Sequence, residues 1–160
     1  MPPKTYPLFA VASEFLRVSS KSNKSLTPLQ LMKLSYISFG WYAANHNKDM
    51  FSERIEAWRL GPVMPALYYE TKHYGRNPVP YSSFFSISNE GIDEFGKGFI
   101  KSVYDQYGHF DGLYLSRLCH QEGSPWEQVY DPDIPWREIP KQIIYSYYKG
   151  KLDEYNSKMG

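Results

Sequence analysis

Length, composition and charge set the first limits on this chain. It has 160 residues and a formal net charge of +1 at pH 7, with 18 Lys and Arg against 17 Asp and Glu. This length suits one domain with a modest core, and we expect residues 1–160 to form a single domain. The nearly neutral charge does not favour a nucleic-acid ligand or an anionic membrane surface, so we expect nucleic acid to be an unlikely partner.

The cysteine content and the apolar pattern indicate a cellular compartment. The single cysteine, Cys119, cannot form a disulfide within the chain, which fits a reducing compartment. No apolar run has the roughly 20 residues that a membrane span needs. Residues 1–16 lack the long apolar segment of a signal peptide. We therefore expect a soluble, cytoplasmic protein with no membrane partner.

Two helices are predicted in the first third of the chain. Apolar residues at helical spacing predict a helix over residues 8–19. The next helix has the clearest start, because Thr27 and Gln30 form a capping box around Pro28 in the first turn. Apolar side chains surround most of this helix, which is typical of a central element. A glycine inside it, Gly40, predicts close packing of another backbone.

A stiff corner follows, where the predicted structure changes from an extended segment to a helix. Residues 56–60 are typical of an extended segment, Gly61-Pro62 is a turn signal, and the chain becomes helical after Pro65 as far as Gly75. Residues 81–88, YSSFFSIS, have a strand-like composition. We expect residues 84–87 to pair with residues 54–58 in a minor two-stranded β element.

The second half of the chain is again predicted to be helical. We expect helices from Glu90 to Tyr107, from Asp111 or Gly112 to Glu122, from Pro125 behind a Ser124 cap, and from Pro140 onward. The predicted fold class is mainly α, a compact single-domain helical bundle with the minor two-stranded β element.

The sequence carries little that predicts catalysis. None of the four histidines shows metal-ligand spacing, and no glycine-rich phosphate loop is present. A nucleophilic site of Cys119, His120 and Glu122 can be imagined, but Cys119 is predicted to face inward, where a thiol is inert. We expect no enzyme activity, no metal and no cofactor. We expect His120 to tie its helix to the 123–126 turn or to the 60–63 corner.

Tyrosine is unusually frequent, with 15 residues. Tyrosine is enriched where proteins bind one another, although a tyrosine-clad surface without a partner is an alternative. We predict a partner interface that includes two groups of tyrosines, one after the stiff corner and one on the last helix: Tyr68, Tyr69 and Tyr74, and Tyr145 and Tyr148.

Three blocks in order resemble the SocA/Panacea family of bacterial and phage antitoxins. They are LTPLQLMKLSYISFGWYAA, then AWRLGPVMPALYYETKHYG, which resembles a family block AW-x-x-GPV-x-P-x-x-Y, and then YLSRLCHQEGSPWEQVY, which resembles L-x-x-x-x-H-x-x-x-PW. The resemblance covers about residues 26–148. Ser35 and Cys119 depart from it, since Leu and Thr are common at those positions. The matched positions, which we expect to build a scaffold, are Trp58, Gly61, Pro62, Val63, His120, Pro125 and Trp126.

This resemblance implies an antitoxin that neutralises a cognate protein toxin by direct binding. Some relatives act as adaptors that hand a toxin to a cytoplasmic protease, and others occur in phages or prophages. The toxin, the surface that binds it and the oligomeric state are left open. A DNA-binding transcriptional regulator and a phage-encoded protease adaptor are the alternative functions.

Overall fold

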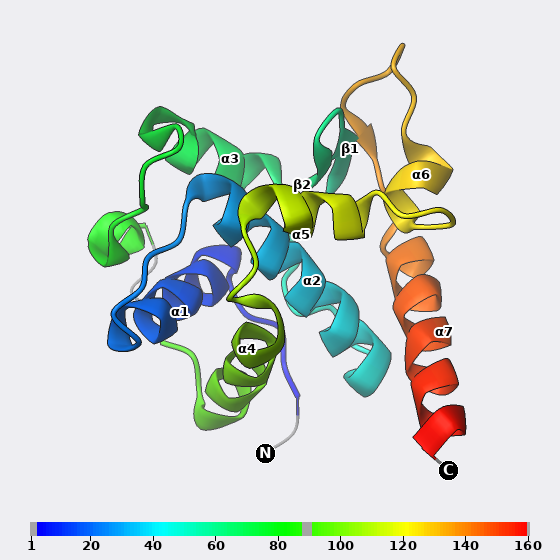
Figure 1. Cartoon of the computed structure of the whole chain (residues 1–160), viewed down its shortest axis with the longest axis horizontal. Coiled ribbons are helices and arrows are strands. Elements are labelled where there is room, and N and C mark those ends of the chain that lie inside the picture. The colour runs from blue at the N-terminus through cyan, green and yellow to red at the C-terminus, as the bar shows by residue number, and fades with distance from the viewer. Residues whose placement is uncertain (1–2, 88–90, 160) are drawn as a thin grey trace.

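The central element of the fold is the helix α2 (Pro28–His46), and the larger helices pack around it (Figure 1). The computed structural model describes residues 3–87 and 91–159. The predicted capping box is confirmed, because the Thr27 Oγ1 atom accepts a hydrogen bond from the Gln30 amide and the Gln30 side chain accepts one from the Thr27 amide. The N–H groups of Thr27 and Gln30 at this helix end are thereby satisfied, and Pro28 has no N–H group to satisfy.

Four helices make the largest contacts with α2 and bury it. These are α1 (Leu8–Lys21), α4 (Glu94–Tyr107), α5 (Gly112–Cys119) and α7 (Lys141–Met159). The predicted helix from Glu90 begins four residues later, behind an Asp93 cap, and Glu90 itself lies outside the described residues. The mainly α class is confirmed. None of the helices in the described ranges is long and apolar enough to cross a membrane.

Short elements connect these helices. The helix α3 (Pro65–Thr71) begins at a proline, as predicted, and two 3₁₀ turns follow, η1 (Lys72–Tyr74) and η2 (Tyr81–Phe84). The helix α6 (Pro125–Val129) starts behind Ser124, whose hydroxyl accepts a hydrogen bond from the Glu127 amide. The Glu127 carboxylate accepts its return bond from the Gly123 amide, one residue before the position expected in a capping box.

The β element differs from the prediction. Three short antiparallel strands, β1 (Glu56–Trp58), β2 (Gly61–Val63) and β3 (Arg137–Glu138), form a sheet in the order β2-β1-β3. The predicted pairing of residues 84–87 with residues 54–58 is wrong. Phe84 ends a 3₁₀ turn behind Pro80 and packs on α1, with its ring centroid 5.2 Å from that of Phe9. Aromatic residues bury equally well from a turn or a strand, so composition alone misled the prediction.

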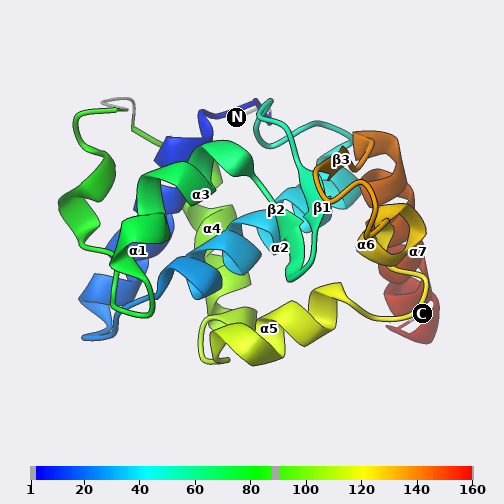
Figure 2. The ribbon, with the colours of Figure 1, turned by 90° about the horizontal axis from the view of Figure 1, so that it is seen from above.

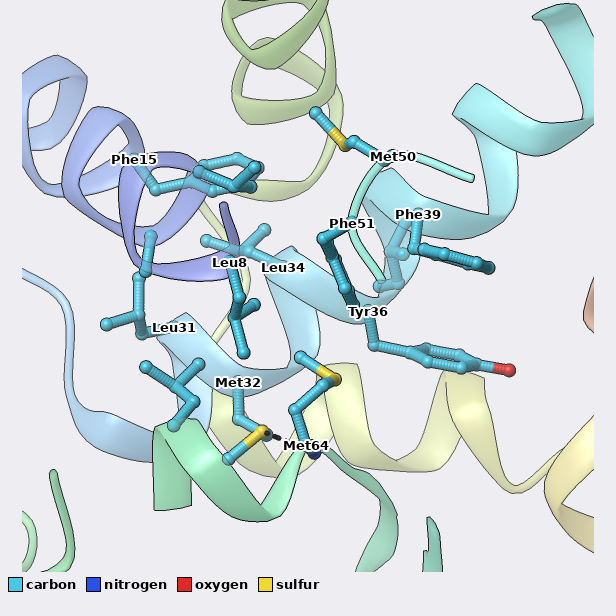
Figure 3. Packing of buried hydrophobic residues seen from close by; sticks show 14 of the residues in the cluster. Leu8, Phe15, Leu31, Met32, Leu34, Tyr36, Phe39, Met50, Phe51 and Met64 are labelled. Atoms are coloured by element: carbon cyan, nitrogen blue, oxygen red, sulfur yellow. Dashed lines mark hydrogen bonds between the residues drawn. The ribbon is translucent and has the colours of Figure 1, made fainter. Parts of the chain in front are cut away.

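The hydrophobic core lies on both sides of α2. Figure 3 shows side chains of α2 meeting Leu8 and Phe15 from α1 and Phe51 from the loop after α2. The rings of Phe39 and Phe51 lie 4.9 Å apart between centroids. The backbone amide of Met64 donates a hydrogen bond to the Met32 sulfur, which joins α2 to the start of α3 (Figure 3). Apolar side chains therefore cover nearly the whole circumference of α2, as its sequence predicted.

A glycine lets α7 approach α2 closely. A Cβ atom at Gly40 would lie 2.3 Å from the ring of Tyr148, so no larger residue fits there without a shift. The close contact predicted for Gly40 is thus with a side chain, and the prediction of a neighbouring backbone is wrong. Tyr148 is only 7% exposed and packs edge-on against Trp41, with ring centroids 5.1 Å apart. The predicted exposure of Tyr148 on a partner surface is therefore wrong as well.

A braced hairpin and a candidate partner-binding groove

The β1–β2 hairpin closes through a turn at Arg59 and Leu60, with Trp58 paired to Gly61. Gly61 has a φ of +118°, a conformation that L side chains rarely adopt. A Cβ atom there would also lie 2.9 Å from the Lys33 Nζ atom and 3.1 Å from the His120 ring. Both the backbone and the crowding therefore require glycine here. The turn predicted at Gly61-Pro62 is wrong, because the chain reverses at Arg59 and Leu60 and Gly61 begins the strand β2.

Side chains from three helices hold the backbone carbonyls of this hairpin. The Trp126 indole N–H from α6 donates to the Trp58 carbonyl at 2.5 Å. The Ser116 hydroxyl from α5 donates to the Leu60 carbonyl at 2.8 Å. The Lys33 ammonium from α2 donates to the Pro62 carbonyl at 2.8 Å. A short hairpin is marginal by itself, so these bonds fix its position against the helices.

His120 stands at the junction of the hairpin, α5 and α6. Its Nδ1 atom lies 2.6 Å from the Ser116 carbonyl oxygen, and its Nε2 atom lies 3.4 Å from the Arg59 carbonyl oxygen. Its ring centroid is 4.1 Å from that of Trp126. The ring therefore contacts both the corner and the turn that the sequence proposed as its partners. Gly61 also lies beside the ring, and Trp126 joins it to the hairpin through its bond to the Trp58 carbonyl.

Replacing His120 by Ala is expected to lower the free energy of unfolding by about 1–2 kcal/mol. The variant loses the hydrogen bond between the His120 ring and the Ser116 carbonyl, and it loses the contact with the Trp126 ring. Urea unfolding of the variant would measure this change. His109, an exposed histidine at the end of α4, provides the matched control, and His109→Ala should change stability little. Equal stability of the two variants would contradict the bracing role of His120.

Lys33 belongs to the candidate site but was not predicted from the sequence. Its side chain is fully buried, and its ammonium donates a hydrogen bond to the Pro62 carbonyl. Burial lowers the pKa of the Lys33 ammonium to about 8. A lysine between Met32 and Leu34, in a helix that is apolar all round, was the available signal. A buried positive charge therefore lies directly beneath the hairpin.

Cys119 does not have the environment of a nucleophile. Burial raises the pKa of its thiol to about 11, so the thiol is neutral near pH 7. The His120 nitrogens are directed at the Ser116 and Arg59 carbonyls, and Glu122 is exposed to solvent. The Cys119–His120–Glu122 arrangement imagined from the sequence is therefore not assembled in the structure.

A groove of about 530 Å³ opens beside the hairpin, between the first half of α2 and the helix α3. Trp58 and Tyr68 contribute aromatic walls, with ring centroids 4.9 Å apart. Leu60, at the hairpin turn, is 61% exposed. The residues that line the groove are Pro28, Leu29, Met32, Lys33, Trp58, Arg59, Leu60, Val63, Tyr68, Thr71, Lys72 and Gly75.

The predicted tyrosine interface is divided between two surfaces. Tyr68 lines the groove and Tyr69, 59% exposed, lies next to it on α3. Tyr74 is half-buried, with its hydroxyl 3.0 Å from the Ser83 hydroxyl. Tyr145 is half-buried on α7, which lies at the opposite end of the molecule from α3 in both ribbon views (Figure 2). One continuous patch of all the predicted tyrosines therefore does not form.

The protein is thus a small, mainly helical domain in which three helices hold the Trp58–Val63 corner in place. The family model described as "Antitoxin SocA-like, Panacea domain" matches residues 31–127, more than half of the chain. The chain belongs to this family. The match is shorter at both ends than the resemblance expected over residues 26–148.

The chain is also similar to a curated relative, "Antitoxin SocA" of Caulobacter vibrioides (strain NA1000 / CB15N). The two are 22% identical over 136 residues, which span 79% of this chain and 72% of the relative. No solved structure matches the chain. The antitoxin-like family assignment therefore rests on similarity of sequence.

Proposed function

We propose that this protein is an antitoxin that neutralises a cognate protein toxin by binding it directly. Membership of the SocA-like antitoxin family supports the antitoxin role and implies a toxin partner in general. The observation that carries direct binding is the open apolar groove beside a hairpin held by three helices. Exposed apolar grooves on rigid supports are typical of surfaces that bind partners.

The proposed neutralisation needs no catalysis by this chain. The buried, neutral Cys119 thiol and the structural contacts of the His120 ring support a binding role in preference to an enzymatic one. A stable complex of this kind buries on the order of 1,200–2,000 Å² in total. The groove and the exposed part of α3 would supply only part of the area that this protein contributes to such a complex.

Co-expression with the adjacent gene tests the proposal. The neighbouring product is induced in a bacterium alone and together with this protein, followed by growth measurement and co-purification. We expect toxicity alone, normal growth together, and co-elution of the two proteins. Normal growth of cells that express the neighbour alone would contradict the toxin–antitoxin pairing.

The level of the toxin separates direct neutralisation from delivery to a protease. If the antitoxin only blocks the toxin, the toxin's half-life after inhibition of protein synthesis should be unchanged or longer with the antitoxin present. A shortened half-life, with rescue lost in a strain lacking the cytoplasmic protease, would favour the adaptor function instead. A complex that forms in vitro from the two purified proteins alone supports direct binding.

A further inference from the structure

The charged residues that line the groove have one sign. Three of its lining residues are cationic, Lys33, Arg59 and Lys72, and no acidic residue is among the described residues that line it. Arg59 and Lys72 are exposed at its rim, whereas Lys33 is buried at its base. A buried charge is screened by salt less than an exposed one. The charged side chains that line the groove are therefore all cationic, on a chain whose net charge is only +1.

The apolar part of the groove offers a place for apolar side chains of a partner. Leu60 is exposed at the turn, and Trp58 and Tyr68 form an aromatic wall beside it. The Lys72 ammonium lies 5.1 Å from the ring centroid of Tyr69, so charge and aromatic surface are adjacent at the rim. A volume of about 530 Å³ holds several side chains of a bound segment.

The support of the groove is fixed before any partner arrives. The Trp58, Leu60 and Pro62 carbonyls are held by side chains of α6, α5 and α2, and Figure 2 shows the hairpin lying beside α2 with α3 following directly from β2. A rigid surface loses little conformational entropy on binding. The groove is thus organised for an occupant that brings complementary charge.

We propose that the occupant is a segment of the toxin that places an apolar side chain between Leu60 and Tyr68 and carboxylates beside Arg59 and Lys72. This inference rests on the proposed function and deepens it by naming the surface and the chemistry of the partner segment. The apolar side chain supplies buried area, and the carboxylates pair with the two exposed cations. The acidic segment is selected over a basic one, because like charges across an interface are repelled.

Binding measurements with purified adjacent-gene product test this inference. Leu60→Asp is expected to weaken the affinity at least tenfold, because it places a carboxylate in the apolar wall and repels the acidic segment. Arg59→Glu combined with Lys72→Glu is expected to weaken it at least tenfold as well. For the wild type, raising the salt from 50 to 300 mM is expected to weaken binding, and this dependence should be much smaller for the double variant.

Matched variants far from the groove serve as controls. Lys48→Glu reverses an exposed charge beyond the opposite end of α2, and Tyr155→Asp alters an exposed aromatic residue on α7. Both should bind the toxin within about twofold of the wild type. Thermal unfolding of every variant confirms that each is folded, which is expected because the substituted side chains are exposed.

The outcomes separate this inference from the proposed function. Wild-type binding that is lost in the groove variants but kept in the controls supports the inference. Tight binding by folded groove variants overturns the inference and leaves direct neutralisation standing. Loss of binding in Tyr155→Asp alone would also overturn it and place the interface on α7. A wild type that rescues growth without binding the toxin overturns both.

Discussion

Replacing Tyr148 by Ala is expected to lower the free energy of unfolding by about 3–5 kcal/mol, the usual cost of truncating a buried aromatic residue. The ring lies between α2 and α7, in contact with Gly40, Trp41 and Tyr36. For a chain of this size, each kcal/mol shifts the melting temperature by about 2–4 °C. Calorimetry or thermal circular dichroism would measure the shift, which should be one of the largest for any single substitution.

Gly40→Ala gives a sharper test of the same contact. A methyl group at Gly40 would overlap the Tyr148 ring, since the added Cβ atom would lie 2.3 Å from it, so the substitution should destabilise the wild type. In the Tyr148→Ala background the ring is absent. There the same methyl group should be neutral or stabilising, because alanine favours the helix by about 1 kcal/mol and partly fills the cavity.

Gly150→Ala is the control for this double-mutant cycle. Gly150 is also helical, in α7, and an added Cβ atom there would meet nothing within 4 Å. It should stabilise the protein by about 0.5–1 kcal/mol in both backgrounds. If Gly40→Ala and Gly150→Ala had the same effect in the wild type, the packing of Tyr148 on Gly40 would be disproved.

Replacing Lys33 by Met is expected to change the pH dependence of stability. Burial lowers the pKa of Lys33 to about 8 in the folded protein, while the unfolded chain has the ordinary value near 10.5. Between these values the unfolded state binds more protons, so this group's contribution to stability rises with pH. The cost of burying the charge is about 3 kcal/mol below pH 8 and is relieved as the pH approaches 10.5.

The stability of Lys33→Met relative to the wild type should therefore fall by about 2–3 kcal/mol between pH 7 and pH 10. Groups with a raised pKa change stability in the opposite direction. The Cys119 thiol is one of them, because its raised pKa makes the fold less stable above pH 9. They are present in both proteins, so most of their contribution cancels in the difference. Urea unfolding across this pH range makes the measurement. Lys48→Met, at an exposed lysine, should show no such trend, and a flat difference for Lys33→Met would contradict the buried-charge assignment.

Local signals in the sequence predicted the local structure well. Thr27, Ser124 and Pro65 each mark a helix start through hydrogen bonds or dihedral angles within a few residues, and all three starts are confirmed. On its other side from β2, the strand β1 pairs with β3, about 80 positions away, and β3 is only two residues long. Such a partner leaves no periodic pattern, so the sequence could not indicate it.

The candidate site was predictable only in part. The sequence placed Trp58 and Gly61 at one corner and indicated that corner as one of two expected partners of His120, and the structure brings the three residues together. It could not show that Lys33 lies beneath that corner, because its place in an apolar helix indicates burial but not which element covers it. It also could not distinguish an inward tyrosine such as Tyr148 from an outward one such as Tyr69, because Tyr suits both environments.

The way the hairpin is held has a consequence for how this scaffold can diversify. At Arg59 and Leu60 the surrounding residues contact the backbone carbonyls, which almost any amino acid supplies, while both side chains remain exposed. These are the two unspecified positions in the AW-x-x-GPV block. Substitutions there can alter the groove's charge and shape without loosening the hairpin. New partner preferences can therefore evolve at these two positions at little cost to folding.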